Sequence, residues 1–197
     1  MQKSVQTLPE GYNEIYSVNL QKDKKTAVIV NVIGGVICAA MLALGYFCFV
    51  PLTEFGGDGE NLFLDLLPML VMLAGVFAYV VLHELTHGAV MKLFGAKKLR
   101  FGYTGLYAYA GSEKDYFGKT AYILVALAPL VFWGVVLTVL LIIVPRNWFW
   151  TVYFIQMMNI SGAVGDLFVT FKFMKMPKDI LVMDTGVGMT VYSKQNN

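Results

Sequence analysis

Four long apolar segments alternate with short polar segments along the chain. The first covers residues 26–50, and the others cover about residues 66–94, 121–144 and 148–173. A transmembrane helix needs about 20 apolar residues to cross the ~30 Å hydrocarbon core of a bilayer, and each segment is long enough. We therefore predict an all-α integral membrane protein in which residues 26–175 form a domain of four transmembrane helices.

The polar linker between the second and third segments has a different periodicity. Between Leu99 and Ala110 the aromatic residues stand at alternating positions broken by glycines: Phe101, Tyr103, Tyr107 and Tyr109. A period of two is typical of a strand, so we predict a short β-hairpin-like segment between the second and third helices. Its three tyrosines are candidate substrate-binding residues that could hold an extended peptide by strand addition. The alternative is an ordinary aromatic belt at the membrane interface.

Residues 1–25 and 176–197 are polar and flank the predicted membrane domain. In residues 1–25 no small-residue cleavage site closely follows the charged positions. This distinguishes these residues from a secretory signal peptide and favours a cytosolic leader. In the C-terminal tail, residues 180–192 are rich in glycine and β-branched residues. This composition predicts a short strand or a loop in the tail, and we expect Asp184 within it to be exposed to the cytosol.

Composition supports a membrane location. The 197 residues are 57% hydrophobic and only 14% charged, whereas about a quarter of a soluble domain is charged. The net charge of +2 gives no reason to expect a nucleic-acid partner. The two cysteines, Cys38 and Cys48, would lie about 15 Å apart on one helix, which is beyond the reach of a disulfide.

The distribution of basic residues predicts the orientation in the membrane. Fourteen of the fifteen Lys and Arg residues fall in the leader, the linker after the second segment and the tail, whereas Arg146 alone lies between the third and fourth segments. Cytosolic loops carry the excess of positive charge. We therefore predict a multi-pass protein of a cell membrane, the plasma membrane of a bacterium, with both termini and the hairpin-like segment in the cytosol.

The second apolar segment ends in the pattern H-E-x-x-H, from His83 to His87, which contains the only two histidines of the chain. On a helix these two residues lie one turn apart on the same face, so both imidazoles can bind one cation. Glu84 stands beside them and can act on a water molecule without being a ligand. Zinc suits two imidazoles and a carboxylate. A chance match and a purely structural metal site are the alternatives.

Asp166 is the only acidic residue inside the predicted helices apart from Glu84, and intramembrane charges are commonly functional. His83 lies eighteen residues beyond Asp65, at the outer end of the second segment, and Asp166 lies nineteen beyond Asn147. Both helices rise by the same distance per residue, so His83 and Asp166 should lie at nearly the same depth in the membrane. Asp166 is therefore a candidate third metal ligand. The alternative is that Asp166 reaches the headgroups or pairs with a lysine. Asn159 is seven residues from Asp166 and shares its face.

Two resemblances rest on these residues. The motif His83-Glu84-Leu85-Thr86-His87-Gly88 and a late intramembrane Asp resemble the site-2 protease class of intramembrane metalloproteases. More closely, Gly165-Asp166 and the segment Asp184-Thr185-Gly186-Val187-Gly188 resemble a bacterial family known as the putative membrane zincin peptidases. The resemblance extends from about residue 66 to residue 192.

The resemblance implies a Zn²⁺-dependent endopeptidase that cleaves membrane-protein or membrane-associated peptide substrates near the cytosolic side of the bilayer. It implies that His83, His87 and Asp166 hold the metal, and that Glu84 is the general base and then the general acid. Asn159 would contribute to substrate binding. The competing hypothesis is a zinc-stabilised, catalytically inactive scaffold or binding protein. A transporter is a weaker third option, because the sequence has no visible internal repeat.

Overall fold

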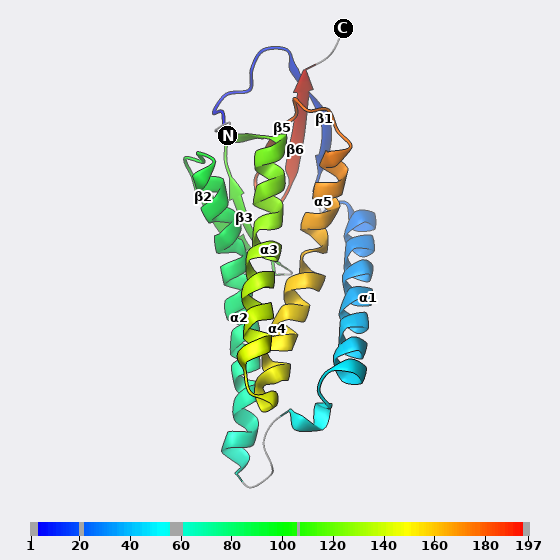
Figure 1. Cartoon of the computed structure of the whole chain (residues 1–197). Coiled ribbons are helices and arrows are strands. Elements are labelled where there is room, and N and C mark those ends of the chain that lie inside the picture. The colour runs from blue at the N-terminus through cyan, green and yellow to red at the C-terminus, as the bar shows by residue number, and fades with distance from the viewer. Residues whose placement is uncertain (1–3, 20–21, 56–60, 106, 195–197) are drawn as a thin grey trace. The chain divides into compact units, whose positions relative to one another are not determined.

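The computed structural model describes residues 4–19, 22–55, 61–105 and 107–194, and Figure 1 shows their secondary structure along the chain. The last three residues of the predicted cytosolic tail lie outside the described residues. The chain divides into two compact units. Unit 1 is assembled from residues 1–30, 84–128 and 165–197, and unit 2 from residues 31–83 and 129–164.

Five α-helices and two short 3-10 helices account for most of the described residues. Four helical stretches are long and apolar enough to cross a membrane, and the fourth of them contains both α4 and α5. The prediction of four long apolar helices is therefore confirmed. The helices are α1 (Lys24–Cys48), η1 (Leu52–Glu54), α2 (Leu62–Leu93), α3 (Lys119–Ile143), η2 (Arg146–Trp148), α4 (Phe149–Gly162) and α5 (Val164–Met174).

The fourth apolar segment is interrupted at Ala163. The backbone there has φ −79° and ψ 7°, so α4 ends at Gly162 and α5 begins at Val164. The sequence predicts one segment over residues 148–173, and the structure divides it into two helices. Asp166 consequently lies in the first turn of α5.

The hairpin predicted between the second and third helices is confirmed. Strand β2 (Leu99–Tyr103) pairs antiparallel with β3 (Ala108–Ser112), from Leu99 opposite Ser112 to Tyr103 opposite Ala108. Among the described residues these two strands form a sheet of their own.

Unit 1 also contains a four-stranded antiparallel sheet in the order β1-β6-β5-β4, which the all-α prediction misses. The leader supplies one strand and the tail supplies two, and these strands are only three to seven residues long. The tail prediction of a short strand or a loop is confirmed, because β5 and most of β6 lie within residues 180–192. The strands in the leader and the linker, and the pairing of the four strands, left little signal in the sequence. The strands are β1 (Tyr12–Val18), β4 (Tyr116–Gly118), β5 (Leu181–Asp184) and β6 (Met189–Lys194).

A core of buried side chains holds the sheet of unit 1 against its helical segments. Phe117 and Val182 from the sheet are fully buried together with Phe173 from α5, and Val125 from α3 is almost fully buried. Lys119 donates hydrogen bonds to the carbonyl of Met174, the last residue of α5, and to that of Met176 at 2.7 Å. This packing fixes the N-terminal part of α3 and α5 from its second residue onward within unit 1.

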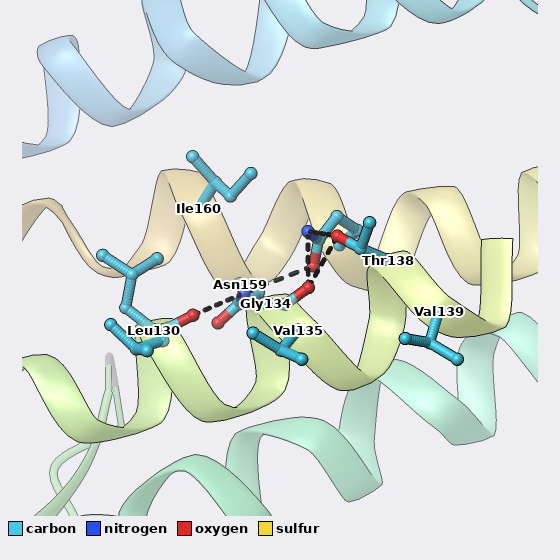
Figure 2. A pocket seen from close by; sticks show the side chains of 9 residues that line it. Leu130, Gly134, Val135, Thr138, Val139, Asn159 and Ile160 are labelled. Carbon is cyan, nitrogen blue, oxygen red and sulfur yellow. Dashed lines mark hydrogen bonds between the residues drawn. The ribbon is translucent and has the colours of Figure 1, made fainter. Parts of the chain in front are cut away.

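Small residues allow the helical segments of unit 2 to pack closely. A Cβ at Gly34 would lie 2.9 Å from the carbonyl oxygen of Ser161, and a Cβ at Gly45 would lie 2.7 Å from the ring of Tyr153. The Tyr153 hydroxyl donates a 2.7 Å hydrogen bond to the carbonyl of Met41. These contacts join residues of α1 to α4. A pocket of about 460 Å³ lies between residues of α3 and α4 (Figure 2).

Candidate metal centre

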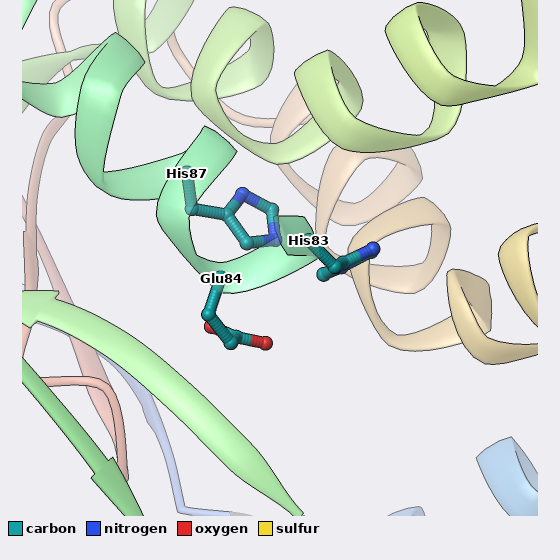
Figure 3. A group of neighbouring side chains, drawn as sticks. All are labelled: His83, Glu84 and His87. Carbon is teal, nitrogen blue, oxygen red and sulfur yellow. The ribbon is translucent and has the colours of Figure 1, made fainter. Parts of the chain in front are cut away.

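Three potential metal ligands lie together on one helix. In α2, His83, Glu84 and His87 each offer one ligand atom, and these atoms all lie within 4.8 Å of one another (Figure 3). His87 is buried, with 8% of its surface exposed, whereas the other two residues are partly exposed. One turn of helix separates the histidines, as the spacing of the motif predicts.

Asp166 lies beside the second histidine. Its Oδ1 atom is 3.5 Å from Nε2 of His87, and both residues belong to unit 1. This distance is short enough for one cation to bind both atoms after a small adjustment of either side chain. The interruption at Ala163 starts a new helix just before this carboxylate.

A backbone carbonyl fixes the ring of His87. Nδ1 of His87 is 2.9 Å from the carbonyl oxygen of Val125 in α3. A carbonyl can only accept a hydrogen bond, so Nδ1 must carry the ring proton. In the neutral ring, Nε2 is then the atom with a lone pair, and it is the same atom that lies near Asp166. Outer hydrogen bonds of this kind commonly orient histidine ligands.

His83 contacts a buried tyrosine one turn earlier in α2. Its Nδ1 atom is 2.8 Å from the hydroxyl oxygen of Tyr79, which also donates a 2.7 Å hydrogen bond to Oδ1 of Asn159 in α4. Asn159 is completely buried. The sequence predicts this asparagine as a substrate-binding residue. The structure shows it buried and bonded to Tyr79, and its role in substrate binding stays a prediction. Tyr79 is absent from the prediction, although it lies four residues before His83 on the same helical face.

Asp184 is buried, and the expectation that it lies in an exposed tail is wrong. Only 8% of its surface is exposed, because β5 packs in the core of unit 1. The hydroxyl of Tyr122 donates a hydrogen bond to Oδ2, and the N–H of Gly186 donates a 2.7 Å hydrogen bond to Oδ1. Burial raises the pKa of the Asp184 carboxyl above its ordinary value.

Comparison with known proteins identifies the class to which this arrangement belongs. Residues 76–181 match the family described as Putative zincin peptidase. The chain belongs to this family. No curated protein and no solved structure matches the chain.

Membership in the zincin peptidase family points to a metallopeptidase and implies zinc. The matched residues include His83, His87 and Asp166, together with the hairpin that follows α2. Two imidazoles and carboxylates are the donor set that zinc takes in catalytic sites, so the residues present fit the metal.

The β2–β3 hairpin of this zincin peptidase packs beside α2, the helix that carries His83, Glu84 and His87. A Cβ at Gly88, the residue after His87, would overlap the ring of Phe101 in β2, so the absence of a side chain permits this contact. The hairpin is therefore held next to the turn of α2 that carries the second histidine, within unit 1.

The three predicted substrate-binding tyrosines have different surroundings. Tyr103 in β2 is 71% exposed. The hydroxyl of Tyr107 is buried and has no hydrogen-bond partner among the described residues, whereas the ring of Tyr109 packs against Gly186 of the β5–β6 turn. Their role in binding a substrate stays a prediction, and Tyr103 is the most accessible of the three.

Proposed function

We propose that the chain is a zinc-dependent intramembrane endopeptidase that hydrolyses peptide bonds near the cytosolic side of the membrane. The observation that carries this proposal is the cluster of His83, Glu84 and His87 on a helix apolar enough to cross a bilayer. In the proposal, His83, His87 and Asp166 hold zinc. The 3.5 Å approach of Asp166 to His87 supports the third assignment.

Glu84 is the residue to which the proposal gives the proton transfers. Zinc, when bound, polarises the carbonyl of the scissile peptide and activates water. The Glu84 carboxylate takes a proton from the attacking water and becomes a carboxylic acid. It then gives this proton to the nitrogen of the leaving amine and returns to the carboxylate. A position next to the ligands in sequence, with a partly exposed side chain, suits both transfers.

The edge of β2 is the proposed binding site for the substrate backbone. A helical substrate hides its peptide groups in internal hydrogen bonds, so it must unwind before cleavage. Among the described residues β2 pairs with β3 alone, which leaves its other edge available for an added strand. The contact between Phe101 of β2 and Gly88 of α2 keeps this strand beside the turn of α2 that carries His87.

The orientation in the membrane is part of the same proposal. Fourteen of the fifteen basic residues fall within the sequence segments of unit 1, and the exception is Arg146 of unit 2. The positive-inside rule favours a cytosolic location for the exposed polar segments of unit 1. Helical substrates would then enter from the lipid and be cleaved near the cytosolic headgroups.

Removing zinc and then adding it back tests whether the protein is a zinc-dependent endopeptidase. Purified protein in liposomes is incubated with a panel of fluorogenic transmembrane peptides, and we expect cleavage that stops with a chelator and returns with Zn²⁺. Metal content is measured on the same samples. One zinc per chain with no cleavage of any peptide would favour the inactive scaffold, and cleavage unaffected by the chelator would exclude a metalloprotease.

A further inference from the structure

A chain of hydrogen bonds in unit 2 begins at the amide of the buried residue Asn159. Its Nδ2 donates to the carbonyl of Leu130 and to Oε1 of Gln156, each at 3.3 Å. Gln156 in turn donates to the carbonyl of Gly134 at 3.3 Å (Figure 2). Because Leu130 offers a carbonyl, which can only accept, the NH₂ group of Asn159 must face it. The amide oxygen is therefore turned toward Tyr79.

The orientation of this amide decides the direction of the next two hydrogen bonds. The Tyr79 hydroxyl has one proton, and it donates that proton to Oδ1 of Asn159 at 2.7 Å. At His83, 2.8 Å away, the same hydroxyl can then only accept. Nδ1 of His83 must therefore carry the ring proton, which leaves the Nε2 lone pair as the ligand atom of the neutral ring.

We propose that Asn159 is a positioning residue that acts through Tyr79 to hold His83 in the tautomer that presents Nε2 to zinc. The inference rests on the proposed function, and it gives Asn159 a different role from substrate binding. Asn159 is completely buried and Tyr79 is 5% exposed, so bulk water cannot readily replace either partner. Losing an outer partner of a histidine ligand costs about 10–100-fold in metal affinity or activity.

The tautomer of His83 can be read directly in the metal-free protein. The chain has only two histidines, so ¹⁵N-histidine labelling gives two ring systems in an NMR spectrum. In the wild type we expect the neutral ring of His83 to be protonated at Nδ1. Asn159→Leu should release the Tyr79 hydroxyl to donate to His83, which moves the ring proton to Nε2. Tyr79→Phe should instead give a mixture of the two tautomers.

A double variant tests whether Asn159 acts through Tyr79. Zinc affinity, measured by competition with a chelator, should fall about tenfold or more in each single variant. Adding Asn159→Leu to Tyr79→Phe should cause little further loss, because the residue that transmits the effect is already changed. Tyr153→Phe is the matched control. It removes another buried hydroxyl of unit 2, which bonds the Met41 carbonyl, and zinc affinity should stay unchanged.

Three results would overturn the inference. One is an unchanged His83 tautomer in both single variants. Another is an equal loss of zinc affinity in Tyr153→Phe, which would mean that the effect is general destabilisation. The third is a raised KM in Asn159→Leu with wild-type zinc affinity, which would restore the substrate-binding role. A wild type that binds no zinc would instead contradict the proposed function, and the metal-free spectra would still decide the tautomer.

Discussion

Both histidines of the motif have Nδ1 within hydrogen-bond distance of an oxygen atom, and in our proposal each presents Nε2 to zinc. His87 donates to the carbonyl of Val125, and in the proposed tautomer His83 donates to the hydroxyl of Tyr79. A ring held in this way loses less rotational freedom when it binds zinc, and its ligand nitrogen is more basic. In the proposed site, the two oxygen partners therefore orient the histidines before zinc binds.

Asp166 and Asp184 are the two aspartates that could complete the metal site, and we predict that Asp166 is the ligand. Asp166→Asn should lower zinc affinity by more than the roughly 10–100-fold expected for an outer partner, because a charged ligand is lost. Asp184→Asn should keep its zinc, since this carboxyl is hydrogen-bonded to Tyr122 and Gly186 within the core. Its effect should appear in stability instead, as a loss of about 1–3 kcal/mol.

Metal analysis and denaturation of the two purified variants check this pair of predictions. Wild-type zinc content in Asp166→Asn, together with lost zinc in Asp184→Asn, would show that the ligand assignment is reversed.

The residues of the site differ in how far the sequence could reveal them. His83, Glu84 and His87 could be predicted because helical geometry alone brings them together. The position of Asp166 beside the motif could be predicted from its depth along an apolar segment, and its role as a ligand stays a prediction. The carbonyl of Val125 could not, because a backbone atom leaves no mark in the sequence.

At the scale of elements, the hairpin gives a sharp test of strand addition. The N–H of Thr104 donates to the carbonyl of Tyr107 at 3.0 Å. Hydrogen-bonded pairs alternate along an antiparallel ladder, so Gly102 should face β3, and Tyr103 should direct its N–H to the outer edge of β2.

Tyr103→Pro should remove one docking hydrogen bond and leave the hairpin paired. One such bond contributes about 1 kcal/mol, so KM should rise about fivefold with zinc content unchanged. Tyr103→Ala keeps the N–H and serves as the control. If the two variants have the same kinetics, the backbone of β2 is not the docking edge, and the aromatic-belt interpretation is favoured.

The elements differ in their dependence on distant partners. Four apolar helices and one hairpin could be predicted, because their patterns are local. The sheet β1-β6-β5-β4 could not, because β1 pairs with β6 from the opposite end of the chain. The break at Ala163 also escaped prediction, since alanine favours helix and carries no signal of interruption.

At the scale of the molecule, the predicted division into residues 1–25, 26–175 and 176–197 follows polarity along the chain. The two units follow contacts instead, and unit 1 draws on all three of these segments. Polarity predicts where a chain meets lipid, but it does not predict which polar segments pack together.

The orientation of the membrane helices can be tested with single cysteines. In a background with Cys38→Ser and Cys48→Ser, Asn147→Cys should react with an impermeant maleimide added to intact cells. Glu113→Cys should react only after the membrane is opened, because the β3–β4 turn is expected on the cytosolic side. Both positions are exposed. Labelling of Glu113→Cys in intact cells would contradict the proposed orientation.

The most direct test of the account is Glu84→Gln. Glutamine is nearly isosteric with glutamate but cannot accept the proton of water, and Glu84 is assigned the proton transfers and not a metal bond. We predict that the purified variant keeps nearly one zinc per chain and has no measurable cleavage of peptides that the wild type hydrolyses. Retained cleavage would exclude Glu84 as the general base, and loss of zinc would mean that Glu84 is itself a ligand.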